Sequence, residues 1–341
     1  MKGNIIVGQS GGPTAAINSS LAGVYRTAID RGAKKVYGMR HGIQGLLNED
    51  YIDLSEHIQT DLDVELLKRT PAAYLGSCRY KLPEIHEDIA TYDKIFSILD
   101  KLEIECFIYI GGNDSMDTIK KLSDYAILRG HPTKFLGVPK TIDNDLALTD
   151  HTPGYGSAAK YIGTSVKEII QDSQALIYDK GLVTIVEIMG RNAGWLVGAA
   201  ALSKGEDCDG PDLIYVPELP FDIDNFLVRI KELLAEKTFV VVAVSEGIRL
   251  ADGRYVCELT DGVDFVDAFG HKQLTGTANY LARRLAQEIG CKTRTIELSS
   301  MQRAASHLAS RIDILEAFQV GGAAVKAADE GDSGEMVILE R

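Results

Sequence analysis

The stretch CFIYIGGNDS, residues 106–115, decides the fold class of this 341-residue chain. Five apolar or aromatic residues are followed by two glycines and then by polar residues, and a helical pattern runs on from Ser115 to Arg129. In that pattern Ile119, Leu122 and Ala126 recur at helical spacing and share one face. A strand, a glycine turn and an amphipathic helix form the repeating unit of parallel α/β sheets.

The same pattern opens the chain. The strand-like run Ile5–Val7 leads into the glycine-rich residues 8–14 (GQSGGPT) and then into a helical pattern over Ala15–Arg31, with Pro13 expected in the first helical turn. Further apolar runs recur at residues 135–138, 183–188, 213–216 and 239–244. The alternation predicts an α/β fold of two Rossmann-like lobes, with mainly parallel sheets and flanking helices.

Length supports two lobes, because single hydrophobic cores stop growing at roughly 250–300 residues. The Gly-, Pro- and Ser-rich stretch Asp150–Ala159 precedes a new helical run at Lys160–Gln171. We interpret it as the crossing between lobes, although an ordinary long loop within one domain has the same composition. The active site is expected in the interlobe cleft.

Charge and composition exclude several classes of function. The formal net charge is −13, which argues against a nucleic-acid surface, and no apolar run approaches the roughly 20 residues of a membrane helix. The N-terminus lacks the pattern of a signal peptide, and the five cysteines form no CxxC pair, so a reducing cytoplasm is expected.

Two glycine turns are candidate anion sites. Glycines let the backbone approach a phosphate, and a helix N-terminus adds free N–H groups. Residues 8–14 and 111–115 both join a strand to a helix, which favours a phosphate site at the carboxyl edge of one sheet. A plain tight turn at the first site, or a helix cap by Asp114 or Ser115 at the second, is the structural alternative.

A third site follows the run 135–138. It reads Pro139-Lys140-Thr141-Ile142-Asp143-Asn144-Asp145. On an extended backbone Asp143 and Asp145 point the same way, one available for a proton and the other for a divalent cation, while Lys140 adds positive charge. A surface turn is the alternative.

These three blocks together resemble the signature of the phosphofructokinase family. The order and spacing continue through Met189-Gly190-Arg191, Ser245-Glu246-Gly247 and Gln302-Arg303, so the similarity covers residues 3–320. The resemblance implies that residues 1–154 together with 304–341 form the lobe for the phosphoryl donor and Mg²⁺, and that residues 155–303 form the fructose 6-phosphate lobe.

The resemblance also implies roles for individual residues. Asp143 resembles the general base, and Lys140, Thr141 and Arg191 are the other expected catalytic residues. The expected donor-binding and donor-selecting residues are Gly12, Arg79, Asn113, Asp114 and Lys140. The expected sugar-phosphate site contains Thr141, Ile142, Asp143, Met189, Gly190, Arg191, Glu246, Arg294, Ser300 and Arg303, with Arg294 and Arg303 clamping the 6-phosphate.

Two residues distinguish between donors. ATP-using relatives resemble Gly-Gly-Asp-Gly-Ser in the second block and carry Gly before Thr-Ile-Asp in the third, whereas this chain has Asp114 and Lys140. An ATP α-phosphate about 4 Å from Asp114 would be repelled by about 1 kcal/mol in water and about 4 at an effective dielectric constant of 20. Lys140 would instead stabilise a phosphate leaving group, so the pair predicts pyrophosphate as donor.

The cofactor expected is Mg²⁺, held by Asp145 and Asn113, since Asn113 stands where the family has an aspartate. Ser300 replaces a usual His or Tyr, and Leu182 replaces an arginine that many ATP-using relatives supply from a neighbouring subunit. The family forms homodimers and homotetramers, and one of these is expected here.

The predicted reaction is reversible transfer from pyrophosphate to the 1-hydroxyl of fructose 6-phosphate, giving fructose 1,6-bisphosphate and phosphate, a step of glycolysis. Three alternatives stay open at this point: an ATP-dependent phosphofructokinase, a non-catalytic regulatory subunit, and a general sugar or nucleoside kinase.

Overall fold

The computed structural model describes residues 3–175, 179–259 and 274–341. The chain divides into two compact units, which we call unit 1 (Met1–Ser157 with Arg303–Arg341) and unit 2 (Ala158–Gln302). The sequence places the corresponding boundaries after residues 154 and 303. The first crossing falls inside a helix, because residues 155–159 form the start of α6 (Tyr155–Gln174). The Gly- and Pro-rich stretch is therefore a loop only over its first half.

Unit 1 contains a six-stranded sheet in the order β10-β5-β4-β1-β2-β3. The strands are β1 (Asn4–Gln9), β2 (Val36–Met39), β3 (Tyr51–Asp53), β4 (Ile104–Gly111), β5 (Lys134–Pro139) and β10 (Glu335–Met336). Neighbouring strands are parallel except for β2 and β3. Its helices are α1 (Ile17–Asp30), α2 (Gly42–Leu47), α3 (Asp61–Arg69), α4 (Ile89–Lys101), α5 (Asn113–Arg129) and α11 (Arg311–Glu330), with short 3-10 turns at Leu54–Glu56 and Ser306–Leu308.

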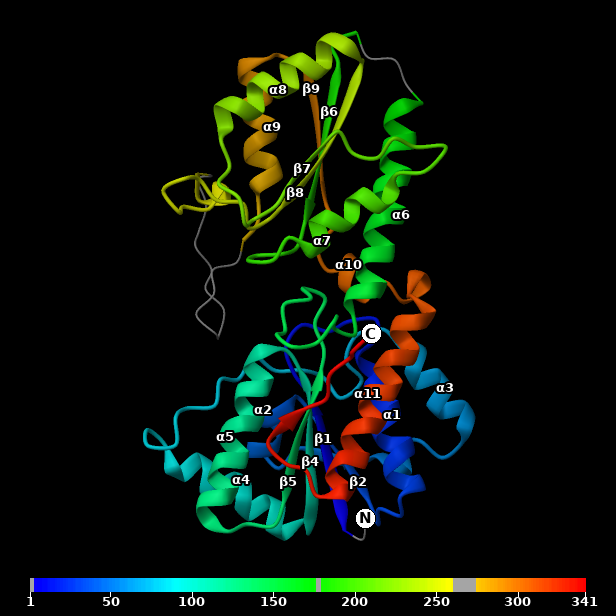
Figure 1. Ribbon diagram of the computed structural model, residues 1–341, viewed down its shortest axis with the longest axis vertical. Helices are drawn as coiled ribbons and strands as arrows, with labels where there is room; N and C mark the ends of the chain where they lie inside the picture. Colours follow the sequence, from blue (N-terminus) through cyan, green and yellow to red (C-terminus); the bar gives the residue numbers. More distant parts are fainter. Residues whose placement is uncertain (1–2, 176–178, 260–273) are drawn as a thin grey trace. The chain divides into compact units, whose positions relative to one another are not determined.

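Helices cover both faces of the unit 1 sheet (Figure 1). Side chains on alternate residues of its buried strands face opposite helical layers. Ile5 and Ile108 face the core covered by α1, α3 and α11, whereas Ile6 and Phe107 face the core covered by α2, α4 and α5. Helices α1 and α11 approach closely, because a Cβ atom on Gly23 would lie only 2.0 Å from a backbone carbonyl oxygen of α11. The unbroken apolar runs of the sequence therefore correspond to strands buried on both faces.

Unit 2 contains a four-stranded parallel sheet in the order β7-β8-β6-β9. The strands are β6 (Leu182–Ile188), β7 (Leu213–Tyr215), β8 (Phe239–Ser245) and β9 (Lys292–Glu297). Its helical segments are α6, α7 (Trp195–Gly198), α8 (Ile223–Glu236), α9 (Thr277–Glu288), 3-10 turns at Ala199–Ser203 and Val256–Leu259, and α10 (Met301–Ala304), which spans the boundary to unit 1. The predicted α/β fold with mainly parallel sheets and flanking helices is confirmed.

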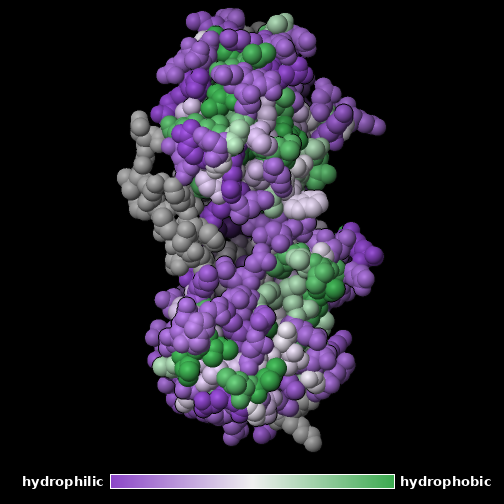
Figure 2. Space-filling model, turned by 60° about the vertical axis from the view of Figure 1, so that its left-hand side comes forward, coloured by the Kyte–Doolittle hydropathy of each residue, from purple (hydrophilic) through white to green (hydrophobic). Residues whose placement is uncertain are grey.

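Hydrophilic residues cover most of the face shown in Figure 2, and apolar residues form separate patches on it. The large apolar side chains of the central strands are buried instead. Among the helices that the structure describes, none has both the length and the hydropathy needed to cross a bilayer.

Candidate functional site

The first glycine turn lies at the carboxyl end of β1. The Ser10 amide donates to the Ile110 carbonyl of β4 (2.9 Å), and the Gly11 amide donates to the Cys78 carbonyl (3.1 Å). Gly11 has φ = +76°, a conformation that favours glycine. The expectation that Pro13 opens the helix is wrong: α1 begins at Ile17, where the Thr14 hydroxyl accepts a hydrogen bond from the Ile17 amide (3.0 Å). Residues 10–16 therefore form a loop between β1 and α1 rather than a direct helix start.

Lys140 lies against this loop. It follows β5 and is buried, with only 3% of its surface exposed, and its Nζ donates to the Gly12 carbonyl at 2.8 Å. Burial lowers the pKa of Lys140 to about 8; the charge of Asp143 raises it, whereas the guanidinium groups of Arg303 and Arg79 lower it further. A buried ammonium beside a glycine loop, with two guanidinium groups near enough to lower its pKa, makes this a candidate anion site.

Arg303 adds to the same site. A Cβ atom on Gly12 would lie 3.6 Å from a guanidinium nitrogen of Arg303, so this side chain lies beside the glycine loop. Arg303 belongs to unit 1, together with Gly12, Arg79 and Lys140. The structure thus brings an arginine expected at the 6-phosphate next to the residues expected to bind the donor.

The second glycine turn joins β4 to α5. A Cβ atom on Gly111 would lie 1.9 Å from the Ser115 Oγ, so this position requires glycine. The structural alternative of a cap by Asp114 or Ser115 does not occur: the N-cap is Gly112, and α5 begins at Asn113. Asp114 is exposed in the first turn of α5, where a carboxylate is stabilised by the helix dipole. Its position therefore has a structural reason independent of donor choice.

The Asp143–Asp145 segment is not the extended backbone that the sequence suggests. Asn144 between the two aspartates has φ = +55°, so the chain bends there. The Asp143 amide donates to the Thr141 Oγ1 (3.1 Å), and the Asp145 carboxylate accepts from the Asn113 side-chain amide (3.1 Å). A local hydrogen bond to Thr141 and a tertiary contact with Asn113, rather than strand alternation, thus position this segment.

Asp145 and Asn113 form the candidate magnesium site. The surrounding protein raises the pKa of Asp145 mainly by desolvation, and the nearby charge of Asp114 adds to the rise. Among the described residues, no group of three or more His, Cys, Asp or Glu side chains is arranged to hold a metal ion. One carboxylate and one amide fit Mg²⁺ all the same, since this ion commonly takes one or two protein ligands, with water and substrate phosphates completing the shell.

Two buried polar side chains, which the sequence did not reveal as part of the site, position the segment bearing Arg79. The Gln9 Oε1 accepts from the Leu75 amide (2.9 Å), and the Asn18 Oδ1 accepts from the Tyr74 amide (2.8 Å). Gln9 also donates to Asn18 (2.8 Å). The sequence did contain a signal: Asn18 lies next to the apolar face of α1, and a buried amide side chain needs hydrogen-bond partners.

The unit 2 residues expected at the sugar phosphate gather where β6 and β8 end. The Ser245 hydroxyl donates to the Gly190 carbonyl (2.6 Å), and the Glu246 amide donates to the Ile188 carbonyl (2.9 Å). A Cβ atom on Gly247 would lie 2.1 Å from the Arg191 carbonyl oxygen. The loops carrying Met189–Arg191 and Glu246 are therefore in contact. A parallel sheet offers its ligand site at this edge.

Arg294 and Ser300 lie elsewhere on unit 2. Arg294 lies on β9 opposite Thr184 of the neighbouring strand β6. Its side chain forms an ion pair with Asp172 of α6 (2.6 Å). Ser300 is exposed in the turn after β9. Within unit 2, Arg294 thus points to a helix rather than joining the loops of Arg191 and Glu246.

The chain is similar to known proteins over nearly its whole length. The family model described as Phosphofructokinase matches residues 4–328. The chain is 42% identical to a pyrophosphate--fructose 6-phosphate 1-phosphotransferase of Xanthomonas campestris pv. campestris over 99% of this chain and 80% of that protein. A protein of the same name from Halomonas elongata is 39% identical over the same shares.

A solved structure gives the same result. The crystal structure of a pyrophosphate-dependent phosphofructokinase from Marinobacter aquaeolei is similar with a TM-score of 0.86 and 36% identity, covering 100% of this chain and 79% of that one. The family match extends over nearly the whole chain and includes all the loops described above. The chain therefore belongs to the phosphofructokinase family.

Proposed function

We propose that this chain transfers a phosphoryl group reversibly from pyrophosphate to the 1-hydroxyl of fructose 6-phosphate. The observation that carries the proposal is Lys140, a buried cation whose Nζ is 2.8 Å from the Gly12 carbonyl. Arg79 and Arg303 lie close enough to lower its pKa further. Three cationic side chains near one glycine loop suit a compact, highly charged donor. The names of the curated relatives support the same donor and acceptor.

Asp114 supports pyrophosphate over ATP. It follows Asn113 in the chain, and its negative charge is near enough to raise the pKa of Asp145. A nucleotide would have to place its α-phosphate and adenylate tail near this exposed acid, at the cost of charge repulsion. Pyrophosphate has no α-phosphate or adenylate tail to place near Asp114, and Lys140 can still stabilise its leaving phosphate.

In the proposed chemistry, Asp143 accepts the proton of the sugar 1-hydroxyl as its oxygen attacks the nearer phosphorus. Lys140 stabilises the negative charge that grows on the leaving phosphate, and Arg191 steadies the transferring group. Thr141 fixes the loop, since its Oγ1 accepts the Asp143 amide. The product phosphate is a nucleophile of comparable energy, so the reaction runs in both directions.

Mg²⁺ is proposed as the cofactor, held by Asp145 and Asn113. When bound, it supplies positive charge to the pyrophosphate oxygens. The hydrogen bond from the Asn113 side-chain amide to the Asp145 carboxylate (3.1 Å), which brings the two side chains together, supports this assignment.

For the acceptor we propose Met189, Gly190, Arg191 and Glu246 on unit 2, with Ile142 from the Asp143 loop. Arg303 and Arg294 are proposed for the 6-phosphate, and Ser300 for a contact near it. Because Arg294 faces Asp172 in its own unit, we propose that it serves a sugar phosphate bound by a second subunit of a homodimer or homotetramer. We place the enzyme in cytoplasmic glycolysis, without nucleic-acid or membrane partners.

The deciding experiment compares pyrophosphate with ATP as donor for purified chain, fructose 6-phosphate and Mg²⁺, in both directions. Turnover with pyrophosphate and a reverse reaction with phosphate are expected. Turnover with ATP alone would refute the donor assignment, and inactivity with both donors would favour a regulatory subunit. The double variant Asp114→Gly with Lys140→Gly should lose pyrophosphate use and gain ATP use.

A further inference from the structure

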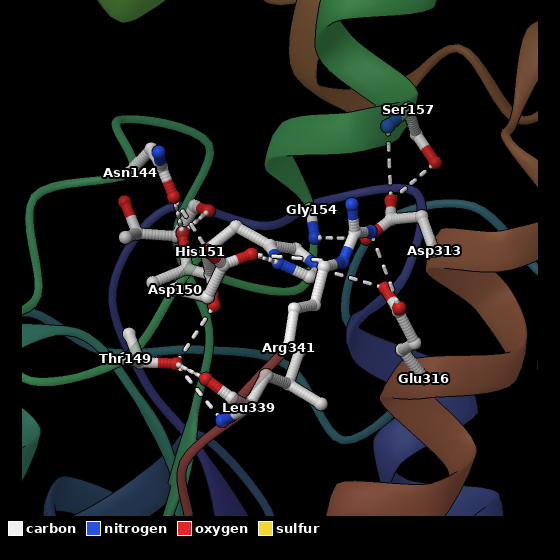
Figure 3. A network of polar contacts seen from close by, with 12 residues as sticks. Asn144, Thr149, Asp150, His151, Gly154, Ser157, Asp313, Glu316, Leu339 and Arg341 are labelled. Atoms are coloured by element: carbon white, nitrogen blue, oxygen red, sulfur yellow. Dashed lines mark hydrogen bonds and ion pairs between the residues drawn. The ribbon is translucent and has the colours of Figure 1, made fainter.

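His151 lies between two carboxylates close to the catalytic loop (Figure 3). Its Nε2 is 2.6 Å from a carboxylate oxygen of Glu316 on α11, and its Nδ1 is 3.0 Å from a carboxylate oxygen of Asp150. An ionised carboxylate only accepts hydrogen bonds, so both ring nitrogens must donate. This geometry requires the imidazolium form, with a proton on each nitrogen.

Charged groups surround the ring from three segments. Glu316 comes from α11, Asp150 from the loop of His151 itself, and Arg341 from the C-terminal segment, 3.6 Å from both acids. Burial lowers the pKa of His151, but hydrogen bonds to Glu316 and Asp150 raise it by more, so the net shift is above the ordinary value of 6.5. Arg341 opposes the rise only weakly.

The residues after His151 hold the catalytic loop. The Thr152 amide donates to the Asn144 Oδ1 (2.9 Å), and the Thr152 hydroxyl donates to the Thr141 carbonyl (2.9 Å). The Thr141 amide donates in turn to the Pro153 carbonyl (3.3 Å). Asp143 lies between Thr141 and Asn144, so its backbone is fixed on both sides by this segment.

A second anchor holds the far end of the segment. The buried Asp313 of α11 accepts from the amides of Gly154 (2.8 Å) and Ser157 (3.0 Å). The Leu339 carbonyl accepts from the Asp150 amide (2.8 Å) at the near end. Residues 150–157 are therefore tied to α11 at two points, of which only the one through His151 depends on an ionisable ring.

We propose that His151 is a positioning residue for phosphoryl transfer: as an imidazolium it ties residues 150–154 to α11 and thereby sets the position of Asp143. The proposal rests on the proposed function of Asp143 as the base. When the ring loses a proton, one nitrogen presents a lone pair to a carboxylate and that contact becomes repulsive. The loop then loosens, and kcat falls. The KM for fructose 6-phosphate changes less than kcat, because Ile142 alone of the proposed acceptor contacts lies in this loop, whereas Arg191 and Glu246 lie on unit 2.

The test compares wild type with His151→Gln from pH 6 to 9. Glutamine can donate to only one of the two acids, so kcat should fall about tenfold at pH 6.5, a loss typical of a slightly misplaced catalytic group. The ratio of wild-type to variant kcat should approach one as the pH passes the pKa of His151. Using the ratio removes the alkaline effect of Lys140, which is present in both enzymes.

The matched control is His131→Gln. His131 also contacts a carboxylate, with its Nε2 2.9 Å from Asp100, but it packs against Phe96 of α4, on the other side of the sheet from α11. This control should leave kcat and its pH dependence unchanged. Glu316→Gln keeps a hydrogen-bond acceptor but removes one negative charge. In this background, the ratio of kcat with His151 to kcat with Gln at position 151 should approach one at a lower pH.

An NMR titration of the His151 ring, assigned by its absence in His151→Gln, should give a pKa above 6.5 and needs no turnover. Unchanged kcat in His151→Gln, a ratio that does not vary with pH, or a ring pKa at or below 6.5 would each overturn the proposal. The kcat comparison uses whichever donor the wild type accepts. A wrong donor assignment would therefore appear in the comparison of pyrophosphate with ATP. It would not be mistaken for failure of the proposal on His151.

Discussion

Replacing Lys140 by methionine should make the free protein more stable and the enzyme nearly inactive. Lys140 is buried, and its pKa is lowered from 10.5 to about 8. A fall of this size corresponds to about 3 kcal/mol of destabilisation at pH 7, where the charged form must be kept in the folded protein. Methionine of similar length removes this cost but loses the hydrogen bond to the Gly12 carbonyl, worth about 1 kcal/mol. The expected net gain is about 2 kcal/mol.

The sign of the pH dependence identifies the cause. Between pH 8 and 10.5 the unfolded chain holds the Lys140 proton while the folded chain has lost it, so wild-type stability rises with pH in this range. Lys140→Met lacks that rise. The gain of the variant over wild type should therefore be full at pH 7 and should shrink, then reverse, as the pH rises from 8 to 10.5. Titrating groups common to both proteins cancel in the difference.

Urea unfolding at several pH values measures the stabilities, and a coupled assay measures turnover. With pyrophosphate, kcat should fall by about 10²–10³, the loss typical when one charge-stabilising donor is removed. Lys121→Met is the matched control. Lys121 is also buried, but its Nζ contacts Asp117 and Glu84, each at 2.8 Å. Burial lowers its pKa, but the two acids raise it by more. Removing Lys121 should destabilise the protein and spare turnover. A Lys140→Met variant no more stable than wild type at pH 7 would refute the reasoning.

Three further predictions concern the base, a buried acid and an ion pair. Asp143→Asn should keep the stability within about 1 kcal/mol but lower kcat by about 10²–10⁴ in both directions, and full activity would contradict its role as base. Burial raises the pKa of Glu187 on β6 from 4.5 to about 7, although the Ala278 amide donates to it at 2.8 Å. The free energy of unfolding should therefore fall as the pH rises from 4.5 to 7. Glu187→Gln should remove up to about 3 kcal/mol of that fall, as measured by urea unfolding at pH 5 and 8. Arg294→Ala should raise the KM for fructose 6-phosphate at least about tenfold, whereas Asp172→Ala, which removes only its exposed partner, should leave KM within about twofold.

Much of the fold was predictable because it depends on local patterns. The unbroken apolar runs around Ile5–Val7 and Cys106–Ile110 indicate strands buried on both faces, and these appear as β1 and β4. Glycine after a strand was equally informative: Gly111 has no room for a side chain beside Ser115. The family was predictable too, since the order of short motifs is a property of the sequence itself.

The candidate site was predictable as a set of residues but not as an arrangement. Lys140 and Asp143 were expected from their motif, yet the burial of the Lys140 ammonium against the Gly12 carbonyl joins positions 128 residues apart. Local propensity describes the preference of a segment by itself and contains no information on so distant a partner. The bend at Asn144 did have a local signal, because asparagine tolerates a positive φ, and in the folded chain the Thr152 amide donates to its side chain.

The sequence by itself determined the α/β class, the glycine turns and the residue types available for phosphoryl transfer, because backbone propensity and hydrophobic periodicity act over a few neighbouring residues. Only the tertiary structure decided which groups lie together: Arg303 beside Gly12, Arg294 against Asp172, and His151 between Asp150 and Glu316. Electrostatic free energies depend on distance and desolvation in space, and separation along the chain does not specify either of them.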